Sequence, residues 1–412
     1  MWCTGVLTRA TCLLAICAAP ASVYAQQPAP PRQDTRTQYP AFLVDSYVGL
    51  TIGFLDDPFS QAQLEAGFHA GSVASPHLAA RVAVFGHEFG RHVAVQGTYM
   101  RSVRFVTYKD VNADAGAHHV WTGFAGATLK GRVPIATRAS LYGEGGLGIT
   151  SRHGFTREEA PVVRDATYAS TLVGAGLDYR LRPTWTLTAG VTYSPPRARD
   201  REPRALLASA GFQYTMRALP EERVEAIERA SAIFPHHHVQ LEYTTAYGYG
   251  ITNFVSKTVP IFWSGNVDVD RGLAAHYDRN VFHTARIFAL DFGVSAAGWR
   301  SQGHRDRFST LSVYPLLRFT LVRTRQADLY VCYSLAGPTY VSKVVIDSRD
   351  TGAHFTFQDF MGAGAFVGPN RRVSVGVKIN HYSNGNLFSQ NAAVTIPLTV
   401  TVGYTFGGAP RM

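Results

Sequence analysis

The sequence predicts an all-β protein made of two tandem eight-stranded antiparallel membrane β-barrels, joined by a short helix and preceded by a cleaved signal peptide. Segments of about 10 to 15 residues with alternating hydrophobicity recur along both halves of the chain. The composition is typical of β-structure, with 20 Tyr, 24 Phe, 38 Gly and 17% charged residues in 412. Beyond the N-terminal segment, no apolar run reaches the roughly 18 residues of a membrane-spanning helix.

The first 25 residues have the pattern of a secretory signal. Arg9 precedes an apolar run from Cys12 to Val23, and the small-x-small site that cleavage requires follows at Val23-Tyr24-Ala25. We therefore expect an exported protein that is cleaved after Ala25, with residues 26–41 as a disordered Pro/Gln-rich segment. Of the four cysteines only Cys332 remains after cleavage, which excludes an intrachain disulfide.

Residues 42–217 contain the eight candidate strands of the N-terminal barrel. Alternation is clear in several of them, because their apolar side chains fall on one face. The expected strands are Leu43–Phe54, Leu78–Phe89, His92–Phe105, His118–Leu129, Ala139–Thr150, Thr167–Tyr179, Trp185–Tyr193 and Leu206–Thr215.

A linker helix is expected within residues 218–235. Pro220 followed by Glu221 and Glu222 is a favourable helix start, because proline suits the first turn and acidic side chains complement the helix dipole. Val224 and Ile227 follow at helical spacing, and the segment ends near Pro235.

Residues 236–406 contain eight further candidate strands, an even number as single-chain bacterial barrels require, and residues 407–412 form a tail. In the last strand, every second residue from Val394 to Phe406 is apolar, which predicts an apolar outside and a small, polar inside. The expected strands are His238–Tyr247, Val259–Val269, Thr284–Ser295, Phe308–Val322, Asp328–Val341, Ala353–Val367, Arg372–Ser383 and Val394–Phe406.

Two other architectures are compatible with this alternation. A soluble β-sandwich also alternates, and sixteen strands could close into one pore. The helix expected between the halves argues against the single pore.

His381 and Ser383 lie two positions apart at the end of the seventh strand of the C-terminal barrel, so their side chains share one face. With both barrel termini in the periplasm, this strand ends outside the cell. Val373, Val375 and Val377 have the same parity, which predicts that the pair faces lipid at the outer leaflet.

A polar pair at this place could simply mark where the strand leaves the hydrocarbon. The following residues favour chemistry instead, because Asn384 can donate a hydrogen bond and Gly385 lets backbone N–H groups turn toward a developing oxyanion. Serine is a weak nucleophile until a base removes its proton, and neutral histidine is the usual base. The spacing therefore predicts an esterase site for a lipid substrate.

From about residue 236 to 406, the chain resembles the outer-membrane lipid A 3-O-deacylases of the PagL type, also grouped as acyloxyacyl hydrolases. The family's H-x-S-N motif is present as His381-Tyr382-Ser383-Asn384, and the asparagine ten residues after the histidine is Asn391. The resemblance implies that His381 is the general base and Ser383 the nucleophile. It also implies an oxyanion hole formed by Asn384 with nearby backbone N–H groups, which we assign to Gly385 and Asn386.

The resemblance further implies hydrolysis of an ester-linked 3-hydroxyacyl chain on lipid A, without Ca²⁺ or any other cofactor. The expected substrate is then lipopolysaccharide, and the expected location is the bacterial outer membrane. The alternative is a catalytically inactive tandem barrel with a structural or adhesive role.

The sequence departs from the family at two positions. Asn386 replaces a glycine three residues after the serine, and Thr395 replaces the acidic residue fourteen after the histidine. Asp359 is a candidate substitute for that acid, since a tight turn at residues 368–370 would place it opposite Ile379 as a diagonal neighbour of His381. The alternative is that a one-residue slip turns Asp359 into the barrel lumen.

No other motif predicts a cofactor, a metal or a nucleic acid. The G-x-G-x-x-G pattern at residues 143–148 lies in strand alternation without a following helix, so we expect a strand rather than a dinucleotide site. Residues 110–114 resemble the start of a calcium loop but lack its glycine, and His236, His237 and His238 are expected to end the linker. The net charge of +10 has no basic-aromatic motif beside it.

Overall fold

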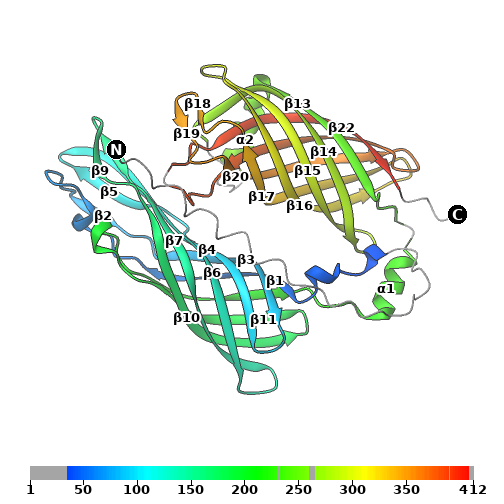
Figure 1. The fold of residues 1–412 in the computed structure, drawn as a ribbon, viewed down its shortest axis with the longest axis horizontal. Coiled ribbons are helices and arrows are strands. Elements are labelled where there is room, and N and C mark those ends of the chain that lie inside the picture. The colour runs from blue at the N-terminus through cyan, green and yellow to red at the C-terminus, as the bar shows by residue number, and fades with distance from the viewer. Residues whose placement is uncertain (1–34, 231, 259–264, 389, 408–412) are drawn as a thin grey trace, which may run out of the picture. The chain divides into compact units, whose positions relative to one another are not determined.

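The computed structural model describes residues 35–230, 232–258, 265–388 and 390–407, which form two closed antiparallel barrels (Figure 1). Each barrel closes on itself: β1 (Ser46–Asp56) pairs with β12 (Ala205–Thr215), and β13 (His237–Thr245) pairs with β22 (Val394–Phe406). The predicted tandem barrels are therefore confirmed, and the single sixteen-stranded pore is wrong. The expected signal peptide lies outside the described residues.

All eight expected strands of the N-terminal barrel are present. They follow one another around the barrel in antiparallel pairs, and β6 and β7 complete the ring. Besides β1 and β12, they are β3 (Leu78–Phe89), β4 (Val93–Ser102), β6 (Asp114–Pro134), β7 (Ala139–His153), β10 (Ala166–Arg182) and β11 (Trp185–Ser194).

Four short strands extend this barrel at the end opposite to the one where β1 begins and β12 ends. They belong to the long loops, and buried side chains such as Phe59, Tyr108 and Val163 form a core of their own there. Their bounds are β2 (Ser72–Ala74), β5 (Val106–Val111), β8 (Phe155–Arg157) and β9 (Ala160–Val163). The short turns gather at the other end, a division of long loops and short turns that is typical of outer-membrane barrels.

The helices are short. The linker helix α1 (Glu221–Glu228) begins after Pro220 as expected and buries Val224 and Ile227. Of the segment 26–41, the structure describes residues 35–41, where η1 (Thr35–Thr37) and the start of η2 (Ala41–Leu43) form 3-10 turns. The other 3-10 turns of the described residues are η3 (Gln61–Gln63), η4 (Ala198–Asp200) and η5 (Ala246–Gly248). No described helix is long and apolar enough to cross a membrane.

The C-terminal barrel also has eight strands, with β13 and β22 as neighbours. Its loop between β17 and β20 carries a small hairpin, β18 (Val345–Ile346) with β19 (Arg349–Asp350). The remaining barrel strands are β14 (Val267–His283), β15 (Phe288–Ser301), β16 (Arg307–Arg323), β17 (Ala327–Val341), β20 (Phe355–Val367) and β21 (Val373–Ser383).

One expected strand of this barrel, Val259–Val269, overlaps the observed strand only at its end. Its residues 259–264 lie outside the described residues, and β14 begins at Val267, after the turn η5 and the helix α2 (Tyr249–Thr258) that follow β13. On β14 the lumen-facing residues include His276, Asp278 and Asn280, which are buried polar groups. Charged side chains that face inward weakened the local signal for this strand.

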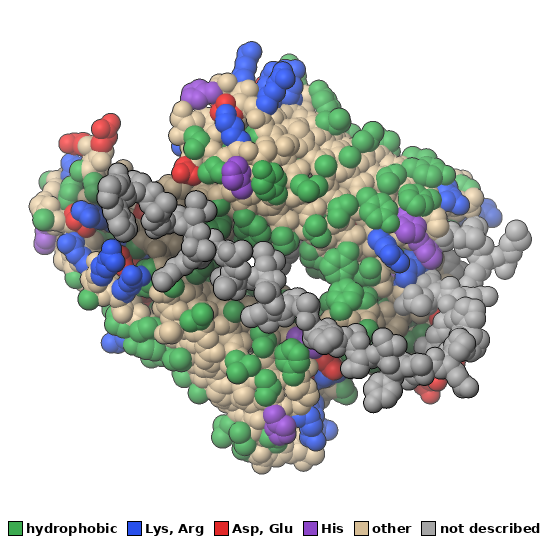
Figure 2. Space-filling model, in the orientation of Figure 1, with side chains coloured by type: hydrophobic (Ala, Val, Ile, Leu, Met, Phe, Trp, Pro, Cys, Tyr) green, Lys and Arg blue, Asp and Glu red, His purple; other side chains and the backbone are tan. Residues whose placement is uncertain are grey.

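The outer surface of the C-terminal barrel is apolar, as Figure 2 shows for the visible face. On β21, Val373, Val375 and Val377 are 46%, 44% and 38% exposed, whereas Ser374 and Lys378, which have the other parity, are buried in the lumen. This alternation confirms the expected lipid face of the strand.

The alternation on β22 breaks at a bulge. Lys378 of β21 pairs with Thr399 but Asn380 pairs with Ile396, so β22 has an extra residue around Pro397. Proline lacks the N–H that a regular ladder needs, which favours a bulge there. Val394 and Ile396 consequently point into the barrel core, and the expectation that they face outward is wrong.

Polar contacts in the lumen hold β21 in register. Asn380 Nδ2 donates to Glu242 Oε1 at 2.7 Å, and Lys378 Nζ donates to Gln240 Oε1 at 2.9 Å. Glu242 also pairs with His276 at 2.9 Å. Buried groups that are satisfied in this way fix one register, because a slip would leave them unpaired.

Candidate functional site

His381 and Ser383 end β21 on its outer face. Their parity is that of Val373, Val375 and Val377, and β21 ends at the rim that carries the long loops. His381 is only 5% exposed, while Ser383 is partly exposed. The imidazole of His381 is thus buried, whereas the serine two residues further along the same face is partly exposed.

His381 lies between two side chains of the neighbouring strands. Asp359 on β20 is its direct partner on one side, and Thr395 on β22 is its partner on the other. Residues directly opposite in an antiparallel pair have Cβ atoms about 4.5–5.5 Å apart and share a face. Asp359 is therefore a cross-strand neighbour of His381 on the lipid side.

The pairing differs by two residues from the expected one, in which Asp359 lay opposite Ile379. Val367 pairs with Val373 rather than near Arg371, because the turn between β20 and β21 extends to Arg371. Arg371 has a left-handed backbone, with φ of 55°, and its N–H donates to the Gly368 carbonyl. A shift of two residues leaves Asp359 on the expected face of β20, the face that His381 has on β21. The Asp359 side chain therefore does not point into the lumen.

The Asp359 carboxylate is held by the neighbouring strand. Its Oδ1 accepts the backbone N–H of Ala336 at 2.5 Å. Ala336 belongs to a bulge in β17, where the pairing shifts between Ser334 and Gly337, and its φ is 50°. Bulges redirect backbone groups beside functional sites, and this one anchors a carboxylate next to the histidine.

The Ser383 hydroxyl oxygen accepts two hydrogen bonds from the loop that follows. Asn391 Nδ2 donates at 3.0 Å, and the backbone N–H of Gly385 donates at 3.1 Å. The side-chain oxygen Oδ1 of Asn391 accepts the Ser383 hydroxyl at 3.3 Å and the backbone N–H of Asn384 at 3.0 Å. Asn391 therefore fixes the position of the serine.

Asn391 was not among the expected site residues, although its distance from the histidine matched the family pattern. That spacing was the available signal in the sequence. The contact itself depends on how the loop folds back, which no local pattern encodes.

The loop turns sharply directly after the serine. Gly385 and Asn386 both have left-handed backbones, with φ of 63° and 59°, and the Leu387 N–H donates to the Asn384 carbonyl at 3.2 Å. Two successive left-handed residues define a type I′ turn, which favours Gly and Asn. Asn386 thus suits the position where the family has glycine.

The three expected oxyanion donors have different surroundings. The Asn384 side chain is 1% exposed, and its Nδ2 donates to the carbonyls of Thr351 at 2.9 Å and Gln390 at 2.6 Å. Its donors are thus engaged in holding the loop. The N–H of Gly385 is the donor that points at Ser383, and the Asn386 side chain accepts from Asn391 Nδ2 at 2.6 Å.

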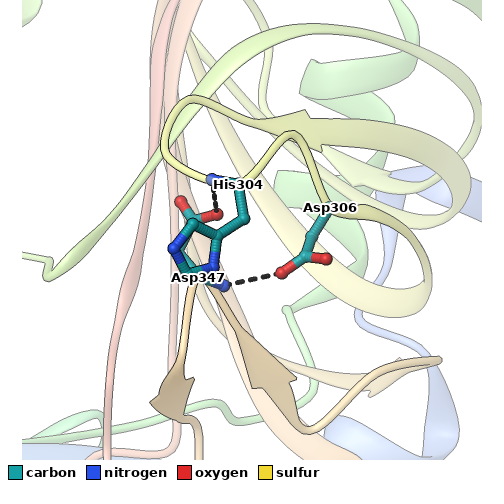
Figure 3. A group of neighbouring side chains, drawn as sticks. All are labelled: His304, Asp306 and Asp347. Carbon is teal, nitrogen blue, oxygen red and sulfur yellow. Dashed lines mark hydrogen bonds between the residues drawn. The ribbon is translucent and has the colours of Figure 1, made fainter.

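A second cluster with chemical potential lies in the loops of the C-terminal barrel. His304, Asp306 and Asp347 have ligand atoms within 4.8 Å of one another (Figure 3). Asp306 and His304 belong to the loop between β15 and β16, and Asp347 to the turn between β18 and β19. Such a set could in principle hold a cation.

The hydrogen bonds of this cluster favour a structural role. Asp347 Oδ1 accepts the His304 N–H at 2.7 Å and its Oδ2 accepts the Gly303 N–H at 3.0 Å. Asp306 accepts Lys343 Nζ at 2.6 Å and the Asp347 N–H at 2.8 Å. Because every carboxylate oxygen has a donor and an ammonium group is adjacent, these residues form a loop latch that joins the two loops.

The remaining sequence motifs are structural. Residues 143–148 lie within β7, a strand, as expected. Of the three consecutive histidines, His237 Nδ1 contacts the Tyr277 hydroxyl at 2.8 Å and His238 Nε2 contacts Ser374 Oγ in the lumen at 2.7 Å. Neighbouring positions on a strand face opposite sides, so these two rings do not converge on one ion.

Two family models match the sequence. Residues 272–405 match the family described as Lipid A 3-O-deacylase (PagL), and residues 10–214 match the family described as Outer membrane protein beta-barrel domain. Together with the two closed barrels, these matches place the protein in the bacterial outer membrane.

Among solved structures, the chain is similar to the outer membrane enzyme PagL, at 16% identity and a TM-score of 0.30, over 41% of this chain and 99% of that one. It is also similar to Ail of Yersinia pestis, at 18% identity and a TM-score of 0.24, over 41% and 99%. The toluene transporter TodX of Pseudomonas putida matches at 8% identity and a TM-score of 0.20, over 88% and 89%. No curated protein matches the sequence.

Proposed function

Residues 272–405 belong to the PagL-type family of lipid A 3-O-deacylases, and on this premise we propose that the protein is an outer-membrane serine esterase. Its substrate is the ester-linked 3-hydroxyacyl chain at the 3-O position of lipid A in lipopolysaccharide. The observation that carries the proposal is the placement of His381 and Ser383 on the outer face of β21, at the rim with the long loops. Lipid A occupies that leaflet.

In the proposed reaction, His381 removes the proton of the Ser383 hydroxyl as its oxygen attacks the ester carbonyl. The carbonyl oxygen becomes an oxyanion, which the N–H groups of the turn at Gly385 and Asn386 stabilise. The histidine then gives its proton to the departing 3-hydroxyl oxygen of the sugar, leaving an acyl-serine. Water, deprotonated by His381, then attacks this ester. The Ser383 oxygen leaves and takes the proton from His381, which releases the 3-hydroxy fatty acid and regenerates the enzyme.

Asp359 is the proposed positioning residue for the histidine. An imidazolium forms during each proton transfer, and an adjacent carboxylate stabilises it and orients the ring. Thr395, on the other side of His381, can accept a hydrogen bond but carries no charge.

Mass spectrometry of lipid A from cells that express the protein tests this proposal. Wild type should remove one 3-hydroxyacyl chain, and Ser383→Ala should leave lipid A intact. Ser374→Ala is a matched control, since Ser374 also contacts a histidine, but in the lumen at 2.7 Å. Heat-modifiable migration on gels checks that both variants are folded.

The second candidate is a catalytically inactive tandem barrel with a structural or adhesive role. The observation that favours it is the absence of an acid at Thr395, together with the engagement of the Ser383 hydroxyl by Asn391. Lipid A that loses no acyl chain through Ser383 would support this candidate and contradict the esterase.

A further inference from the structure

An apolar stripe on the outer face of β13 continues into α2. Leu241 and Tyr243 are 61% and 55% exposed on β13, as expected for a lipid-facing strand. Beyond the end of the strand, Tyr247 is 98% exposed, and Ile251 and Phe254 on α2 are 53% and 67% exposed. Ile251 and Phe254 are three positions apart, so they share one helix face.

The strand topology explains why α2 lies outside the barrel. β13 ends at Thr245, and above it β14 and β22 pair directly in parallel, with Asp268 opposite Thr395. The barrel wall therefore closes without η5 and α2, which follow β13. The hydroxyl of Tyr249, at the start of α2, donates to the Thr395 backbone carbonyl at 3.1 Å.

Close packing at the bulge of β22 fixes the start of this helix. A Cβ atom at Gly248 would lie 2.6 Å from the Leu398 carbonyl oxygen and 3.1 Å from Pro397. Thr252, on the opposite side of α2 from its apolar face, is 4% exposed. The helix thus has one side against the barrel and one apolar side directed away from it.

This arrangement places α2 beside the candidate site. Thr395 contacts α2 through Tyr249 and is also the cross-strand partner of His381. The contact with α2 is through the backbone carbonyl of Thr395, which lies near the start of β22 (Val394–Phe406). The apolar side of α2 is continuous with the lipid-facing surface of the barrel, so the surrounding medium there is the outer leaflet.

We propose that α2 is an interfacial helix whose Ile251 and Phe254 side chains insert among the acyl chains of lipid A, and that it guides the substrate's acyl chain toward Ser383. The first part depends only on the membrane location, and the second rests on the proposed function. Short helices with one apolar face bind at the boundary of headgroups and acyl chains. A chain that lies along α2 would pass the Thr395 side of His381.

Nitroxide labels test the insertion without any reference to catalysis. Single cysteines at Ile251, Phe254 and Asn253 are labelled in a Cys332→Ser background, in vesicles that contain lipid A. Asn253 is the matched control, because it is an exposed polar residue of the same helix. We expect labels at 251 and 254 to be accessible to oxygen and protected from a water-soluble nickel chelate, and the label at 253 to show the reverse. Equal nickel accessibility at all three positions would overturn the proposal.

A comparison of hydrolysis rates on two ester substrates tests the guiding role of α2 separately from the proposed esterase activity. Phe254→Ser should lower the deacylation of lipid A in vesicles about tenfold, while leaving the hydrolysis of a water-soluble short-chain ester unchanged. Equal effects on both substrates would contradict a role in guiding the acyl chain. If wild type hydrolyses neither substrate through Ser383, the esterase proposal fails, and the label accessibilities still decide whether α2 inserts.

Discussion

Asp359 on β20 lies directly opposite His381 on β21, on the lipid side of the barrel. The family's acidic position is Thr395, which is the partner of His381 on the other strand. The two strands that flank the histidine thus offer equivalent places for an acid. In the proposed mechanism, Asp359 on β20 takes the part of the acid that the family has on the other side of the histidine.

Replacing Asp359 with asparagine should reduce deacylation about 100-fold. The amide keeps the size of the side chain and an oxygen for the Ala336 N–H, but it cannot stabilise an imidazolium by charge. The rate constant of purified wild type and variant is compared on lipid A in vesicles. Full activity of Asp359→Asn would end the idea that this residue positions the histidine.

A second-site change distinguishes a charge effect from a structural one. Adding Thr395→Glu to Asp359→Asn restores an acid beside His381 on the family's side. We expect the double variant to be at least ten times as active as Asp359→Asn alone. A double variant as inactive as Asp359→Asn, with normal heat-modifiable migration, would indicate that Asp359 acts through local structure instead.

The barrel architecture could be predicted because the alternation of apolar residues that indicates it lies within each single strand. A strand with one face in lipid needs an apolar side chain at every second position, and fifteen residues suffice to show this. The signal failed for β14, where inward groups such as His276 and Asp278 obscure the pattern. It also failed for α2, whose Ile251, Thr252 and Val255 are β-branched, so that its helix depends on packing against β22.

The site could be predicted only in part for the same reason. The common face of His381 and Ser383 follows from their spacing. The partner of His381 depends on the length of the turn that ends at Arg371, and the orientation of Thr395 depends on the bulge at Pro397. Turn length and bulges are set by interactions between strands, which a single sequence does not display.

Asn391→Ala should lower deacylation about tenfold, the equivalent of one hydrogen bond. Asn391 holds the Ser383 oxygen and the Asn384 N–H, so its loss lets the nucleophile leave its position. Gln390→Ala is the matched control, since its side chain is exposed. Release of 3-hydroxy fatty acid is measured for both. Equal activity of the two variants would contradict the role of Asn391.

Gly385→Ala should lower the free energy of unfolding by about 1–2 kcal/mol, the cost of a left-handed backbone for a residue with a Cβ. Its φ is 63°, and a Cβ atom there would meet nothing within 4 Å. Asn386→Gly should change stability by no more than about 0.5 kcal/mol, because asparagine already tolerates this conformation. Urea unfolding in lipid vesicles measures both. Equal destabilisation would indicate that the turn is not left-handed in solution.

The loop latch should open in acid. The Lys343 ammonium and the Asp347 N–H lower the pKa of Asp306 below its ordinary value. Although partial burial acts to raise the pKa of Asp347, hydrogen bonds from Ser301, His304 and Gly303 lower it overall. Carboxylates with a depressed folded pKa stabilise the fold fully above their ordinary value of about 3.9, and lose this contribution as the pH falls through the folded pKa.

NMR of the side-chain carboxyl carbons of Asp306 and Asp347 follows this transition. Both carbons should keep the shifts of ionised carboxylates from pH 7 to about pH 5, and move together toward the shifts of protonated acids below about pH 4. Millimolar Ca²⁺ or Zn²⁺ at pH 7 should leave these shifts unchanged, because donors already occupy the carboxylate oxygens. A saturable metal-dependent shift would mean that His304, Asp306 and Asp347 form a cation site instead of a latch. A midpoint above pH 5 would show that the hydrogen bonds do not hold the carboxylates in their charged form.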